Sequence, residues 1–76
     1  MTTLADLSVG ASARVISVTG QAALEQRILE MGVLPGVQVK VVRQAPLGDP
    51  IEIRVMGYSL SLRRSEAACI EVEVQT

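Results

Sequence analysis

The chain has 76 residues, of which 49% are hydrophobic, with one aromatic residue, one cysteine and no histidine. Seven basic and eight acidic residues give a net charge of −1, so the basic excess typical of nucleic-acid binders is missing. Without histidine the chain cannot form a Ser–His–Asp or Cys–His catalytic arrangement, and one cysteine cannot form an internal disulfide or a CxxC zinc site. We therefore expect a non-enzymatic protein without a cofactor, folded as one domain over residues 1–76.

The N-terminal segment lacks the basic and apolar regions of a signal peptide. No stretch of the sequence approaches the roughly 18–20 apolar residues that span a bilayer. We therefore expect a cytoplasmic protein that does not insert into a membrane and does not bind nucleic acid.

The first predicted elements are a helical turn and a strand. Thr3 is a residue type that caps helices, and it favours a single turn over residues 4–7. Residues 13–18 carry apolar side chains at both alternating sets of positions, which predicts a strand that is largely covered on both faces.

Residues 21–31 form the clearest predicted helix. Leu24, Ile28 and Met31 share one face, and Gly32 is typical of the position that ends a helix. Leu29 points away from that face. Two interpretations of Leu29 remain open: it packs under a neighbouring loop, or it belongs to an apolar patch that contacts a partner.

In the remainder of the chain, apolar and polar residues alternate over short segments separated by Gly and Pro, a pattern typical of short strands. The predicted strands are residues 37–42, 51–56, 59–62 and 69–74, with a single helical turn over residues 63–67 and a turn or bulge at Gly57-Tyr58. Glycines, prolines and one aspartate set the connecting turns and loops: Gly32, Pro35, Gly36, Pro46, Gly48, Asp49, Pro50 and Gly57.

Five short strands in so small a chain cannot cover their inner faces in a flat sheet, whereas a strongly bent barrel removes exposed edges. We therefore predict a mainly β fold, a small SH3-like barrel of about five strands with one helix inserted between strands 1 and 2. Proline-rich peptides need an aromatic groove, which Tyr58 alone cannot build, so this class of ligand is not expected.

Candidate sites for ions are weak. Asp49 and Glu52 are the best candidates for a loose surface contact with a divalent metal, but two carboxylates without His or paired Cys do not make a dedicated site. Asp49 between Gly and Pro is also a common turn residue. Arg63 and Arg64 either dock on an acidic surface or are solvated charge.

Three linked motifs resemble the ferrous iron transport protein A (FeoA) family. They are R-x-L-E-x-G-x-x-P-G over residues 27–36, P-L-G-D-P over residues 46–50, and G-x-x-L-x-L-R-x-x-E-A over residues 57–67. The resemblance extends from about residue 4 to residue 74. It implies an SH3-like accessory protein of bacterial ferrous iron uptake that modulates a membrane iron permease by docking on its GTP-binding region. The protein would then lie at the inner membrane only through that partner.

We expect the docking surface to combine apolar and basic residues near the helix and the proline loop: Leu29, Val33, Leu34, Leu47, Arg27, Arg63 and Arg64. Several alternatives remain open. One alternative is that some of the apolar residues belong to the core, and another is that the patch closes a homo-oligomer. A third alternative is that the protein binds or delivers ferrous iron weakly, and a fourth is that one of the arginines acts in trans on GTP hydrolysis.

Overall fold

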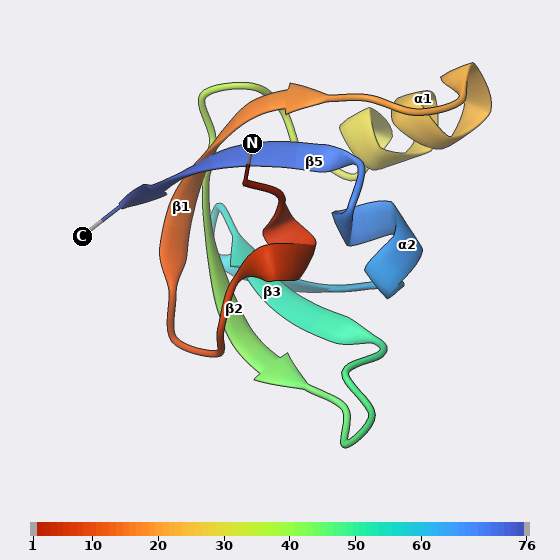
Figure 1. Cartoon of the computed structure of the whole chain (residues 1–76). Coiled ribbons are helices and arrows are strands. Elements are labelled where there is room, and N and C mark those ends of the chain that lie inside the picture. The colour runs from red at the N-terminus through yellow and green to blue at the C-terminus, as the bar shows by residue number, and fades with distance from the viewer. Residues whose placement is uncertain (1, 76) are drawn as a thin grey trace.

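Five antiparallel strands form one sheet in the order β4-β3-β2-β1-β5 in this computed structural model, which describes residues 2–75 (Figure 1). The strands are β1 (Ser12–Val18), β2 (Gln38–Gln44), β3 (Ile51–Val55), β4 (Tyr58–Leu62) and β5 (Ile70–Gln75). A 3₁₀ turn, η1 (Leu4–Asp6), precedes β1, a helix, α1 (Ala22–Glu30), follows it, and a short helix, α2 (Arg64–Ala67), precedes β5. The predicted mainly β fold with its helix after the first strand is confirmed.

The sheet bends around a core of aliphatic side chains. β3 shows the alternation most clearly, because Ile51, Ile53 and Val55 are fully buried while Arg54 faces solvent. The molecule measures 29 × 26 × 25 Å, and η1 contacts both α2 and β5. Figure 1 shows η1 lying in the concavity of the bent sheet.

Two β-bulges help to bend the sheet. The pairing of β1 with β5 shifts between Val15 and Ser17, and the pairing of β2 with β3 shifts between Val41 and Arg43. Ile16 at the β1 shift is 47% exposed, and Arg14 is exposed as well, so the prediction that this strand is largely covered on both faces is wrong.

The hairpin between β3 and β4 corrects one sequence prediction. Tyr58 is the first residue of β4 and pairs with Val55, whereas we expected Gly57-Tyr58 to form the turn. The two turn residues are Met56 and Gly57, with positive φ values of 51° and 88°. Two-residue hairpin loops favour this geometry because its twist matches that of the flanking strands, so Met56 leaves the predicted third strand.

The two edges of the sheet differ. The Val72 N–H donates to the Thr2 carbonyl at 2.9 Å, and Thr3 forms a bridge with Glu71, so the N-terminal residues lie along the outer edge of β5. Within residues 2–75, the outer edge of β4 pairs with no other strand. No helix in these residues is long and apolar enough to cross a membrane.

A capping box holds η1 in place beside the covered edge. The Asp6 carboxylate accepts the Thr3 backbone N–H at 2.8 Å and the Thr3 hydroxyl at 3.1 Å. These hydrogen bonds lower the pKa of the Asp6 carboxyl, the backbone bond having the larger effect. The predicted helical turn after Thr3 is therefore present, as η1.

Candidate partner-binding surface

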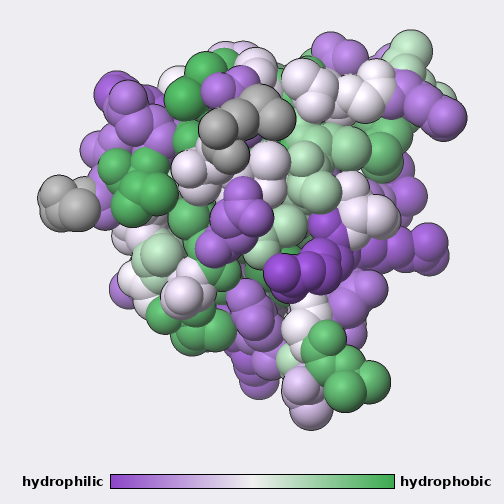
Figure 2. Space-filling view, viewed as in Figure 1, coloured by the Kyte–Doolittle hydropathy of each residue, from purple (hydrophilic) through white to green (hydrophobic). Residues whose placement is uncertain are grey.

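The loop between β2 and β3 carries the most exposed large apolar side chain of the described chain. Leu47 is 96% exposed, and Figure 2 shows hydrophobic atoms at the tip of this loop, projecting from the lower right of the molecule. The Gly48 N–H donates to the Ala45 carbonyl at 2.7 Å and closes a turn with Pro46 and Leu47 at its centre. Pro46 fixes its own φ in this turn, so Leu47 is displayed on a constrained backbone.

Arg64 fastens this loop to the body of the protein. Its guanidinium donates to the Gly48 carbonyl at 3.4 Å and to the Ala5 carbonyl of η1 at 3.1 Å. Its backbone N–H donates to Asp49 Oδ1 at 3.0 Å. Arg64 is therefore a structural link between the loop, η1 and α2, which limits its availability for a partner.

The two weak metal candidates have other bonds in the structure. Asp49 accepts the first N–H of α2, and Glu52 accepts two hydrogen bonds from the Arg43 guanidinium, at 2.9 and 3.1 Å. Within residues 2–75, no group of three or more His, Cys, Asp or Glu side chains is arranged to hold a metal ion. In the structure, Asp49 caps α2 and Glu52 forms an ion pair with Arg43.

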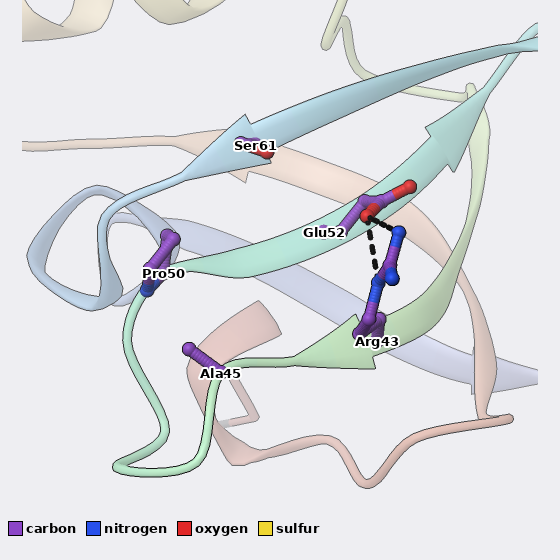
Figure 3. Close-up of a pocket in the computed structure, with 5 residues that line it drawn as sticks. All are labelled: Arg43, Ala45, Pro50, Glu52 and Ser61. Atoms are coloured by element: carbon purple, nitrogen blue, oxygen red, sulfur yellow. Dashed lines mark hydrogen bonds and ion pairs between the residues drawn. The ribbon is translucent and has the colours of Figure 1, made fainter.

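A small open cavity lies beside the Arg43–Glu52 ion pair. Its volume is about 130 Å³, and Figure 3 shows the residues that line it, which are Arg43, Ala45, Pro50, Glu52 and Ser61. The cavity lies next to the base of the Leu47 loop, because Ala45 and Pro50 are the residues where that loop leaves and rejoins the sheet.

A second exposed apolar region lies at the opposite end of β2, where α1 leads into that strand. Leu34 is 44% exposed and Met56 is 71% exposed. The Tyr58 hydroxyl donates to the Met31 carbonyl and ties the β3–β4 hairpin to the end of α1. Gly32 lies directly beneath that hydroxyl, so any side chain at Gly32 would collide with Tyr58.

These positions correct the predicted docking surface. Val33 is fully buried, so the prediction that it faces a partner is wrong. Leu29 is partly buried and packs against the core, which favours the interpretation that it packs within its own fold. Leu34 and Leu47 are exposed, but they lie at opposite ends of β2 (Figure 1). The four apolar residues do not form one patch, because the strand separates the two exposed ones.

Glu66 has a structural role that goes beyond its place in the motif over residues 57–67. It is the one buried charged side chain among the described residues, 5% exposed. Its Oε1 accepts the Arg63 N–H at 2.8 Å, and its Oε2 lies 3.4 Å from Arg27 Nη1 on α1. Arg27 thus joins the two helices, while Arg63 is exposed and makes no ion pair within residues 2–75. A glutamate at the third position of a short helix is the sequence signal that indicates such a cap.

Comparison with known protein families gives a clear result. A family model described as the FeoA domain matches residues 2–74. The chain belongs to the FeoA family. This FeoA-family chain is 46% identical, over 71 residues, to the Fe(2+) transport protein A/Fe(2+) transporter FeoB fusion protein of Porphyromonas gingivalis. The match covers 93% of this chain but only 8% of the length of the fusion protein.

Solved FeoA structures share the fold. The solution structure of FeoA from Chlorobium tepidum has a TM-score of 0.91 and 40% identity, covering 99% of this chain and 71% of that one. FeoA of Stenotrophomonas maltophilia, complexed with zinc and described as a prokaryotic SH3 domain protein, has a TM-score of 0.84 and 32% identity. That match covers 96% of this chain and 91% of the other. The predicted SH3-like architecture is therefore confirmed.

A more distant likeness extends beyond FeoA proteins. IdeR of T. acidophilum has a TM-score of 0.84 at 20% identity, covering 97% of this chain and 34% of that one. At this level of identity the likeness concerns the fold alone.

Proposed function

We propose that this FeoA-family chain is a non-enzymatic accessory domain of ferrous iron transport, which docks on the GTP-binding region of a membrane iron permease and modulates uptake. It would act in the cytoplasm and be held at the inner membrane through that permease.

The observation that carries the proposal is the fusion relative. In that protein a segment 46% identical to this chain is part of the same polypeptide as a protein named Fe(2+) transporter FeoB. Covalent linkage keeps two modules at a high effective concentration, which is useful when they work in contact. Wherever the two modules are separate polypeptides, a docking surface would have to supply the same contact.

The Leu47 loop is the best candidate for that surface. An apolar side chain that is 96% exposed loses much hydration on binding. The Arg64 hydrogen bonds and the turn at Pro46 hold the loop in one conformation, so ordering it on a partner costs little conformational entropy.

Replacing Leu47 by aspartate is expected to weaken association with the permease at least about tenfold, a change of about 1.4 kcal/mol in binding free energy. The measurement is co-purification and affinity of this chain with the permease in detergent, with and without a GTP analogue. Val9→Asp is a matched control, because Val9 is also an exposed apolar loop residue, at 56%, and lies in the turn before β1. Equal binding by the two variants would contradict the assignment of this loop.

The proposal also holds that the chain supplies no catalytic arginine. Of the three arginines considered, Arg27 and Arg64 are engaged within the protein, which leaves Arg63, the residue before α2, as the candidate without an ion pair within residues 2–75. We expect Arg63→Ala to leave the GTP hydrolysis rate of the permease–accessory complex within about twofold of the wild-type complex. An arginine supplied in trans is worth about 10³–10⁵ in rate, so a loss approaching that size would show that the chain takes part in hydrolysis.

A further inference from the structure

Two neighbouring basic side chains on the outer face of the sheet make no ion pair within residues 2–75. Lys40 on β2 and Arg54 on β3 are directly opposite each other in the strand register, and both are exposed. The same row continues to Ser12 on β1 and to Ser59 on β4. We call these four residues, Ser59, Arg54, Lys40 and Ser12, the cation row.

Like charges directly opposite on neighbouring strands destabilise a sheet. Within residues 2–75 neither Lys40 nor Arg54 makes an ion pair or a side-chain hydrogen bond that would offset the repulsion. An exposed strand position accepts almost any polar residue, and arrangements that break a local rule are expected at functional or strained sites, so this pair is a candidate binding site.

The other two cations of this face are already neutralised. Arg14 lies 3.3 Å from Glu73, and Arg43 lies 2.9 Å from Glu52. Four of the seven basic residues of the chain therefore share one face, and within residues 2–75 the two of them that make no ion pair are adjacent, in the cation row.

We propose that the cation row binds the carboxylate of an acidic protein segment. Lysine ammonium, arginine guanidinium and serine hydroxyl groups can all donate hydrogen bonds to a carboxylate. The guanidinium of Arg54 can bind the two carboxylate oxygens as a fork, while Lys40 adds a second positive charge beside it. One carboxylate bridging the pair would remove the repulsion that the unbound protein carries.

The surrounding charges favour a discrete carboxylate over a membrane surface. Glu52 and Glu73, with side chains 25% and 60% exposed, lie on the same face and would be repelled by a continuous anionic surface. Binding to anionic lipids typically uses about four to eight uncompensated Lys and Arg residues, whereas this face offers two. This inference does not depend on the proposed function, because the Leu47 loop is a separate feature.

The test is a titration of the ¹⁵N-labelled protein with a capped tetra-glutamate peptide at low ionic strength. We expect saturable chemical-shift changes at the amides of the cation row, which weaken as salt is added because exposed charges are screened. A capped tetra-glutamine peptide of equal length should produce no saturable change. Shifts confined to other residues, or none, would overturn the proposal.

Three variants separate a local site from net charge. Lys40→Ala and Arg54→Ala should each weaken tetra-glutamate binding at least about fivefold. Arg63→Ala removes the same charge outside the cation row, beyond the end of β4, and should change the affinity less than about twofold. Equal losses of peptide affinity in all three variants would show that only net charge matters, and would overturn the site. Binding to phosphatidylglycerol vesicles without binding to the peptide would also overturn it. Thermal unfolding confirms that each variant is folded.

Discussion

Replacing Gly32 by alanine is expected to destabilise the protein by about 2–4 kcal/mol. Gly32 has a φ of +95°, a conformation that costs a residue with a Cβ about 1–2 kcal/mol. The new methyl group would also collide with the Tyr58 hydroxyl and break its hydrogen bond to the Met31 carbonyl, a bond worth about 1 kcal/mol. Thermal unfolding should show a fall in Tm of at least about 8 °C, because a domain of this size loses about 4–8 °C per kcal/mol.

Gly36 is the matched control for this substitution. Its φ is +92°, but no atom outside its chain neighbours lies within 4 Å of the position that a Cβ would occupy. Gly36→Ala should therefore cost only the backbone strain, about 1–2 kcal/mol. In a Tyr58→Phe background, Gly32→Ala should fall to the same cost, since the colliding hydroxyl is gone. If Gly32→Ala costs the same in both backgrounds, the collision contributes nothing.

Replacing Glu66 by alanine is expected to cost about 2–3 kcal/mol. The carboxylate is 5% exposed and accepts the Arg63 N–H at 2.8 Å, and a hydrogen bond to a charged group is worth about 1.5–3 kcal/mol. Its removal also takes away the cap of α2 and the partner of Arg27, which together hold α2 against the rest of the fold. Urea unfolding monitored by circular dichroism measures the loss.

Two further variants show how much of the stability lost in Glu66→Ala comes from the helix cap and how much from the ion pair. Arg27→Ala should cost less than about 1 kcal/mol, because the Arg27 side chain is 64% exposed and solvent screens its charge. Glu66→Gln keeps an oxygen that can accept the Arg63 N–H, so its cost should fall between those of Glu66→Ala and Arg27→Ala. A loss in Arg27→Ala as large as that in Glu66→Ala would instead make the ion pair the main contribution.

Most elements could be predicted from local patterns, because strand alternation and helix spacing depend on residues close in sequence. The failures occur where a distant contact decides the local conformation. Tyr58 follows a glycine and suggests a turn, yet it begins a strand, and its hydroxyl donates to the Met31 carbonyl, 27 residues away in the sequence. Met56 then takes the positive φ of the turn, a conformation that its residue type does not indicate.

The binding surface was less predictable than the fold for a related reason. Val33 and Leu34 are neighbours of similar hydrophobicity, and only the packing of the chain buries one and exposes the other. The pairing of Lys40 with Arg54 depends on the register of β2 and β3, which the spacing of these residues in the sequence does not reveal. The role of Arg64 depends on its hydrogen bonds to Gly48 and Ala5, which are distant in the sequence, so neither docking on an acidic surface nor solvated charge describes it.

The difference between the two sheet edges restricts how copies of this protein can associate. Thr2 and Thr3 occupy the outer edge of β5, whereas within residues 2–75 no strand pairs with the outer edge of β4. A sheet open at both edges can add molecules indefinitely and grow into a fibre. Because Thr2 and Thr3 already cover the part of the β5 edge at Glu71 and Val72, we expect an added strand from a second copy to pair with β4 rather than with that part of β5.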